Sequence, residues 1–262
     1  MEKRKIIQIM VLITFLGMIT VNALANILPI NGMTTGDISN MYQNLFAPTG
    51  ITFSIWGLIY LLLGAYTLYQ FGLFGKGKIN EKTIKKISFY FILTSIANML
   101  WILAWHYNFI LLSLVLIVTI FYYLIKIADI INKQEFNIIE RVCVCAPFTI
   151  YFGWITVATI ANVTVFLVSI NWDGLGISPV IWTMFILLVG TIIGILRMFK
   201  DVNPLYGLIF VWAYLGIWIK HTSPTGFDNM FPEIIYTVIS LIVLLLVGIG
   251  FVGYKKLKTF SP

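Results

Sequence analysis

Long hydrophobic segments alternate with short polar ones along the chain, at about residues 6–29, 50–73, 88–106, 109–131, 143–169, 179–198, 204–220 and 232–254. A helix needs roughly 20 apolar residues to cross a hydrocarbon core of about 30 Å, and each segment approaches that length. Only helices and closed barrels satisfy their backbone groups inside a bilayer. The pattern therefore predicts an all-α fold, a polytopic membrane helix bundle of about eight transmembrane helices.

The basic residues alternate between the connecting segments. They precede the first hydrophobic segment and follow the second, fourth, sixth and eighth, and of the 17 in the chain only Lys220 lies in an odd-numbered loop. Because positive residues in short loops stay in the cytoplasm, this alternation predicts a multi-pass protein of the cytoplasmic membrane with both termini inside. Cleavage after Ala23-Leu24-Ala25, which resembles a signal-peptide site, would leave seven spans with the same charge pattern. We favour an uncleaved first helix, because Asn22, Asn26 and Pro29 extend it to spanning length.

Composition agrees with a membrane protein and excludes a soluble globular domain. Hydrophobic residues make up 60% of the chain and charged residues 10%, and the mean hydropathy is +0.97. The net charge of +7 is spread over the cytoplasmic ends of the predicted spans. It therefore indicates orientation and contact with membrane lipids, and no nucleic-acid partner is expected.

Residues with catalytic chemistry are sparse in the predicted spans. The acidic residues, which mark proton and cation pathways inside membranes, all fall in predicted loops or at helix ends, and this disfavours an ion-coupled transporter. The sequence lacks the motifs of zinc proteases, serine hydrolases and phosphate-binding loops. We therefore expect no catalytic residues and a protein that is not an enzyme.

Two histidines and two cysteines are the residues best suited to metals. His106 and His221 each lie beside a predicted external loop, where an imidazole could ligate haem iron, although a single interfacial histidine is more often a solvated polar tip. Cys143 and Cys145 are two residues apart at the start of a helix, so their side chains diverge. We interpret both cysteines as buried apolar side chains, and we predict no metal site.

Aromatic and amide side chains recur at helical spacing in three of the predicted helices. The three faces carry, in turn, Phe53, Trp56, Tyr60 and Gly64; Thr94, Asn98, Trp101 and Trp105; and Pro147, Tyr151, Trp154, Ala158 and Asn162. An asparagine facing hydrocarbon would leave its donors and acceptor unpaired, so these faces point towards protein, water or a bound molecule. They either pack helices together or line a site for a flat aromatic ligand, and the spacing alone does not distinguish the two.

At these three faces the sequence resembles the TspO/MBR family, the tryptophan-rich sensory proteins related to the mitochondrial translocator protein. The first face keeps the family's order of proline, glycine, phenylalanine, tryptophan, tyrosine and glycine at Pro48, Gly50, Phe53, Trp56, Tyr60 and Gly64. The second keeps its asparagine and tryptophan at Asn98 and Trp101, and the third its tyrosine, tryptophan and asparagine at Tyr151, Trp154 and Asn162. The resemblance covers about residues 6–170.

This resemblance implies five helices around a pocket that binds tetrapyrroles. The ligand-binding residues that it implies here are Pro48, Gly50, Phe53, Trp56, Tyr60, Asn98, Trp101, Trp105, Tyr151, Trp154, Ala158 and Asn162. The chain departs from the family pattern at Met41, Ile51 and Ser54, and its span-five proline, Pro147, sits earlier. Because Ile51 replaces a pocket tryptophan, the porphyrin-degrading reaction of some members is disfavoured here, and weak porphyrin photo-oxidation is a third alternative that the resemblance alone implies.

The last three hydrophobic segments have no counterpart in a five-helix family. We therefore expect two domains: residues 1–175, a TspO-like five-helix bundle with the ligand pocket, and residues 176–262, a three-helix membrane extension. The extension covers one flank of the bundle or forms an oligomer surface, and a homodimer is compatible with either arrangement.

The function that this resemblance implies is that of a membrane sensor or carrier for porphyrin, haem or a similar flat hydrophobic molecule. The tetrapyrrole would be a ligand and not a required cofactor, with membrane lipids as the other partners. The alternative is a multi-pass transporter or permease-like subunit, in which the three additional helices complete a translocation path.

Overall fold

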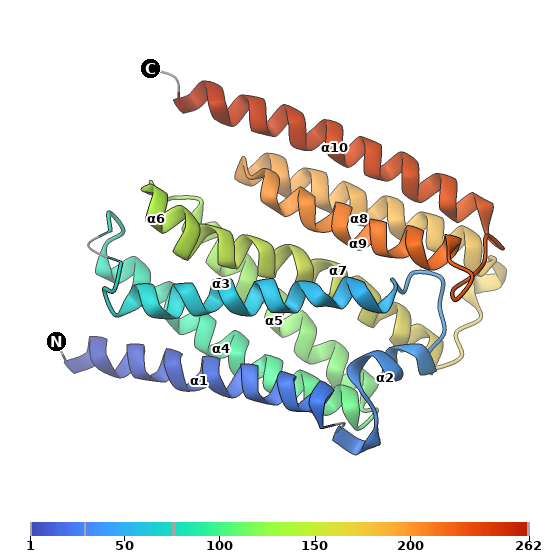
Figure 1. Ribbon diagram of the computed structural model, residues 1–262, viewed down its shortest axis with the longest axis horizontal. Helices are drawn as coiled ribbons and strands as arrows, with labels where there is room; N and C mark the ends of the chain where they lie inside the picture. The colour runs from blue at the N-terminus through green and yellow to red at the C-terminus, as the bar shows by residue number, and fades with distance from the viewer. Residues whose placement is uncertain (1, 29, 75–76, 261–262) are drawn as a thin grey trace. The chain divides into compact units, whose positions relative to one another are not determined.

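The computed structural model describes residues 2–28, 30–74 and 77–260, and within these ranges the regular structure is entirely helical (Figure 1). The long helices are α1 Glu2–Ile27, α3 Ile55–Gln70, α4 Glu81–His106, α5 Ile110–Ile131, α7 Ala146–Ser169, α8 Pro179–Asp201, α9 Pro204–Thr222 and α10 Pro232–Phe260. The short elements are η1 Ile30–Gly32, α2 Thr35–Met41, η2 Gly50–Ser54, α6 Ile138–Glu140, η3 Arg141–Cys145 and η4 Gly174–Gly176. The predicted all-α class is confirmed.

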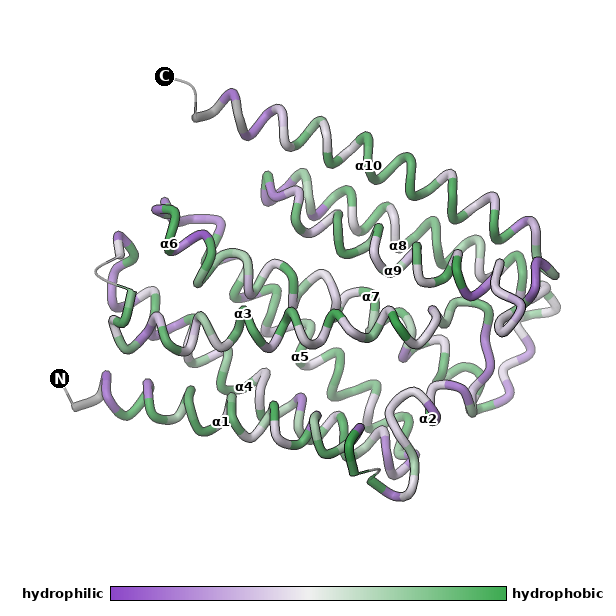
Figure 2. The backbone as a smooth tube through the Cα atoms, in the orientation of Figure 1, coloured by the Kyte–Doolittle hydropathy of each residue, from purple (hydrophilic) through white to green (hydrophobic). Residues whose placement is uncertain are grey.

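Seven of the described helical segments are long and apolar enough to cross a membrane: Arg4–Ile27, Gly50–Gln70, Glu81–His106, Ile110–Ile131, Ile138–Ser169, Pro179–Asp201 and Pro232–Lys256. Figure 2 shows hydrophobic residues along these helices and hydrophilic ones near their ends and in the loops. The remaining predicted segment, 204–220, is also helical and forms α9, but it lies outside this set. The mean hydropathy of its 19 residues is lowered by Lys220, His221, two tyrosines and two tryptophans.

The chain forms two compact units. Unit 1 comprises Met1–Asn40 and Trp56–Ile155, and unit 2 comprises Met41–Ile55 and Thr156–Pro262. In unit 1, α4 packs against α1 and α5, whereas in unit 2, α8, α9 and α10 pack pairwise and η2 packs against α9. The division at residue 175, which was drawn from family resemblance, stays a prediction, because the compact units follow other boundaries.

Polar side chains determine where several helices begin. The Asn80 side chain accepts a hydrogen bond from the Thr83 amide (2.8 Å), and the Ser178 and Asn203 side chains cap α8 and α9, each of which opens with a proline. These residues satisfy amides that have no partner within the helix. Because the caps satisfy these amides, α4, α8 and α9 can begin directly after short polar loops.

Glu140 anchors the polar end of unit 1. Its side chain is completely buried and accepts hydrogen bonds from the Tyr69 hydroxyl (3.0 Å), the Ile79 amide (2.8 Å) and the Asn137 amide (2.9 Å). The Glu140 amide donates to the Asn137 side chain (2.8 Å), which completes a capping box. One carboxylate thereby joins the end of α3, the following loop and the start of α6.

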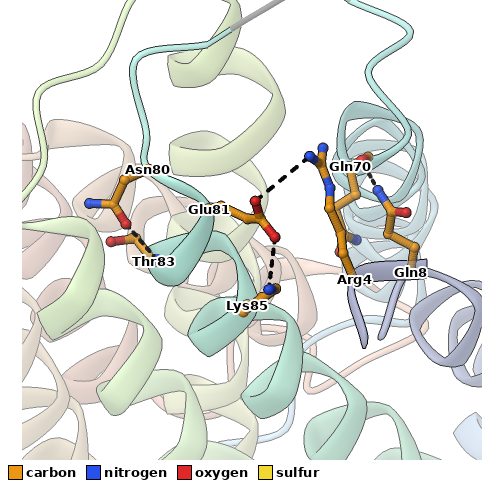
Figure 3. Close-up of polar contacts among 7 residues, drawn as sticks. All are labelled: Arg4, Gln8, Gln70, Asn80, Glu81, Thr83 and Lys85. Atoms are coloured by element: carbon orange, nitrogen blue, oxygen red, sulfur yellow. Dashed lines mark hydrogen bonds and ion pairs between the residues drawn. The ribbon is translucent and has the colours of Figure 1, made fainter. Parts of the chain in front are cut away.

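The same end of unit 1 carries polar contacts between α1, α3 and α4 (Figure 3). The Glu81 carboxylate lies between Lys85 (2.7 Å) and Arg4 (4.0 Å), and the Gln8 side chain donates to the Gln70 carbonyl. The two ion pairs are half exposed, so their contribution to stability is small. The Arg4–Glu81 pair links α1 to α4, and the Gln8–Gln70 hydrogen bond links α1 to α3.

Candidate functional site

Unit 1 contains a cluster of aromatic rings, and Trp56 on α3 is at its centre. The Trp56 ring stacks on Tyr60 at a centroid distance of 5.4 Å. Tyr151 lies 6.0 Å from it, and Trp101 and Trp154 each lie 6.4 Å from it. The cluster extends along α4 through Trp105, which stacks on Trp101 at 6.2 Å. The aromatic residues that three separate helices present at helical spacing therefore meet in one place.

A chain of amide hydrogen bonds adjoins this cluster. The Asn22 side chain on α1 donates to the Asn98 carbonyl oxygen (2.6 Å), and the Asn98 amide donates to the Tyr151 hydroxyl (3.4 Å). Asn98 and Tyr151 are completely buried, and Asn22 is 6% exposed. Asn98 was predicted to face protein, water or a bound molecule; its side chain is buried, and its polar group is engaged by side chains of α1 and α7.

The rings of the cluster differ in accessibility. Trp101, Trp105, Tyr151 and Trp154 are at most 5% exposed, whereas Trp56 and Tyr60 are half-buried. An incoming molecule would meet α3 first, because the indole of Trp56 and the ring of Tyr60 are the accessible members of the cluster. The buried rings behind them form a rigid wall.

The other predicted ligand-binding residues belong to unit 2. Pro48 and Phe53 are half-buried, and Gly50 is exposed, with no atom within 4 Å of the position that a Cβ would occupy. In the second half of α7, the buried Asn162 amide donates to the Ala158 carbonyl (2.9 Å), one turn earlier in the same helix. The two groups of predicted residues thus lie in separate compact units, and their assignment to one pocket stays a prediction.

The contact between the segment 41–55 and α9 was not predicted from the sequence. The Thr49 amide donates to the Gly216 carbonyl (3.1 Å), and the Trp212 indole N–H donates to the Thr52 carbonyl (2.9 Å). The His221 Nε2 atom bonds the Leu45 carbonyl (2.9 Å). Three groups of α9 therefore hold the segment that leads into α3, and neither a motif nor helical spacing indicated this contact.

Both histidines are buried, so their interpretation as solvated polar tips was wrong. His106 Nε2 lies 3.0 Å from the Thr35 hydroxyl and Nδ1 lies 3.1 Å from the Ile30 carbonyl, so both ring nitrogens are engaged. The His221 ring packs on Phe227 at 4.7 Å. Their role in the structure is to fix loops.

Metal and thiol chemistry are weakly represented. Among the described residues, no group of three or more His, Cys, Asp or Glu side chains is arranged to hold a metal ion. Cys143 is buried, as expected, whereas Cys145 is half-buried and its Sγ atom lies 3.9 Å from the Thr149 hydroxyl.

After α1, the Thr34 hydroxyl and amide both donate hydrogen bonds to the Asp37 carboxylate (2.7 and 2.9 Å). These bonds lower the pKa of the Asp37 carboxyl from its usual value.

A comparison with protein families identifies the family to which the sequence belongs. A model of the TSPO-like protein family matches residues 8–251. The chain belongs to this family. The match of this TSPO-like protein includes α8, α9 and most of α10, for which the resemblance to five-helix proteins offered no counterpart. No curated protein and no solved structure matches the chain.

The amide chain gives a direct test of the packing in this TSPO-like protein. Asn98→Ala leaves the Asn22 amide and the Tyr151 hydroxyl without their buried partner, so the free energy of unfolding should fall by about 1–2 kcal/mol. Equilibrium unfolding in mixed micelles measures the change. Asn44→Ala, which removes only contacts within the loop 42–46, is the matched control and should cost less.

Proposed function

We propose that this TSPO-like membrane protein binds a tetrapyrrole, or a similar flat hydrophobic molecule, at the aromatic cluster of unit 1. The observation that carries the proposal is the convergence of Trp56, Tyr60, Trp101, Tyr151 and Trp154, with centroids 5.4–6.4 Å from the central ring. Aromatic faces stack on flat π-systems, and membership in the TSPO-like family supports this choice of ligand.

In this proposal the accessible and the buried rings have different roles. Trp56 and Tyr60 supply the stacking surface, because they are the half-buried members of the cluster. Asn98 and Tyr151 hold the wall behind them in place through their shared hydrogen bond. Ligand binding would replace some ring–ring contacts within the protein by contacts between the rings and the ligand. The affinity therefore depends on the difference in free energy between these two sets of contacts.

The proposed role is that of a sensor or carrier in the cytoplasmic membrane, with both termini on the cytoplasmic side and without catalysis. The charge alternation supports the orientation. Haem would bind mainly through its ring, and His106, the histidine next to Trp105, would not ligate the iron, because both of its nitrogens already have hydrogen-bond partners. We therefore expect similar affinities for haem and for metal-free protoporphyrin.

Titration of the purified protein with protoporphyrin, followed by quenching of tryptophan fluorescence, tests this proposal. Trp56→Leu/Tyr60→Leu removes both accessible rings and should weaken binding about 10- to 100-fold, since each stacked ring contributes about 1 kcal/mol or more. The matched control is Trp218→Leu, which removes an aromatic residue of α9 that is 37% exposed.

Saturable quenching in the wild type and in the Trp218 variant, with a large loss in the double variant, is the expected result. Equal affinities in all three proteins would exclude the aromatic cluster as the binding site. The alternative function, a transporter or permease-like subunit, would in addition move porphyrin across the membrane of sealed vesicles. The proposed sensor or carrier would bind porphyrin without such flux.

A further inference from the structure

A second site lies in unit 1, away from the aromatic cluster, in an open groove of about 700 Å³ between the start of α4 and the end of α5. Among the described residues that line it, five are lysines and Asp129 is the single acid. The lysines are Lys82, Lys85, Lys86, Lys126 and Lys133. The groove is therefore strongly basic.

The lysines are arranged on two facing walls. Lys82 and Lys86 are four residues apart and share one face of α4, whereas Lys126 lies on α5 and Lys133 lies in the turn that follows α5. Lys85 forms an ion pair with Glu81 at 2.7 Å, which reduces the charge that it offers to the groove. On the α5 side, the Lys126 Nζ atom lies 5.0 Å from the centroid of the Tyr122 ring, and Asp129 offsets part of the charge of Lys126 and Lys133. The groove thus keeps two lysines from α4 and two from the end of α5, with one acid among them.

Deeper along α4 the lining becomes aromatic. Phe89 is 56% exposed, and the Tyr90 ring lies 5.8 Å from that of Tyr123 on α5. Aromatic residues of this kind are enriched at the level of lipid headgroups. A ligand with anionic groups at one end and hydrocarbon at the other would match the order of lysines and rings along the groove.

We infer that this groove binds an anionic phospholipid of the cytoplasmic leaflet, and that its two walls favour a lipid with two phosphates. Basic pockets between helices on the cytoplasmic side bind headgroups of this type, and ammonium groups bind phosphate as point charges. A diphosphatidylglycerol can place one phosphate against Lys82 and Lys86 and the other against Lys126 and Lys133. A phosphatidylglycerol carries a single phosphate and can engage only one of the two lysine pairs with it.

Native mass spectrometry of the delipidated protein, titrated with diphosphatidylglycerol, phosphatidylglycerol or phosphatidylcholine, tests the inference. We expect one tightly bound diphosphatidylglycerol, weaker phosphatidylglycerol and no retained phosphatidylcholine. Lys82→Gln/Lys126→Gln removes one lysine from each wall and should weaken diphosphatidylglycerol about 25-fold, since each lysine contributes about fivefold. Lys86→Gln/Lys133→Gln is a second such variant and serves if the first does not fold.

The control variant is Lys256→Gln/Lys258→Gln, which removes the same charge from the end of α10, outside the groove. It should keep wild-type affinity. Equal weakening in the control would show that net charge alone attracts the lipid, and retention of phosphatidylcholine would show binding through the acyl chains alone. Complete displacement by millimolar inorganic pyrophosphate would identify a soluble anion as the ligand, and each of these three results would overturn the inference.

Discussion

Replacing Glu140 with alanine should lower the free energy of unfolding by about 3–5 kcal/mol, which is the largest effect that we expect for a single substitution. The buried carboxylate accepts three hydrogen bonds, from the Tyr69 hydroxyl and from the amides of Ile79 and Asn137. In the variant the buried Tyr69 hydroxyl and the two half-buried amides lose their acceptor, and the hydroxyl left without a partner costs more than its bond stabilises. Equilibrium unfolding in mixed micelles measures the change.

Two further variants show whether this loss comes from the hydrogen bonds. Glu140→Gln keeps one acceptor oxygen and the side-chain volume, so it should lie between the wild type and the alanine variant. Glu135→Ala removes an exposed acid from the same loop and should change stability by less than about 0.5 kcal/mol. Similar losses for Glu135→Ala and Glu140→Ala would contradict the anchoring role.

The second large effect is expected for Gly216→Ala, at about 2–4 kcal/mol. A Cβ at this position would lie 2.8–2.9 Å from the Cγ2 and Cβ atoms of Thr52 and would also meet its hydroxyl oxygen. Contacts this close cannot persist, so the segment 41–55 must move away from α9. The Thr49 amide would then lose its bond to the Gly216 carbonyl. Unfolding measurements give the cost, and faster hydrogen exchange at Thr49 would locate it.

Gly250→Ala is the matched control for this substitution. Gly250 lies on α10, and no atom lies within 4 Å of the position that its Cβ would occupy. Alanine is the better helix former by about 1 kcal/mol, so this variant should be as stable as the wild type or more stable. A loss at Gly250 equal to that at Gly216 would indicate a general effect of glycine replacement and would refute the proposed close approach.

The positions of the long helices could be predicted because they depend on local composition. Seven of the eight hydrophobic segments meet the requirements for a span, and the eighth is helical as α9. The predicted ends were less exact. The segment predicted to begin at residue 88 starts at Glu81, since Asn80 caps the helix about two polar turns earlier than hydropathy alone indicates. The short elements between the spans, such as α2, have no hydrophobic signal and were missed.

The aromatic side of the candidate site was also predictable, because residues at helical spacing on one face must meet a neighbouring helix. Trp56, Trp101 and Trp154 illustrate this, and the amide of Asn98 is buried as its polarity requires. Which groups bond one another was not predictable. The pairing of Trp212 with Thr52, or of Glu140 with Ile79, joins residues far apart in the chain, and neither helical spacing nor motif records such pairs.

The attachment of the segment 41–55 to α9 limits how the polypeptide can be divided. A protein truncated after residue 175 would still contain the first five long helices, but it would lose the carbonyl of Gly216, the indole of Trp212 and the imidazole of His221. The segment 41–55 would then lack the α9 groups that hold it in place. Loss of the last three helices during evolution would therefore demand compensating substitutions near Thr49 and Thr52, and shortened forms of such proteins should differ in that region.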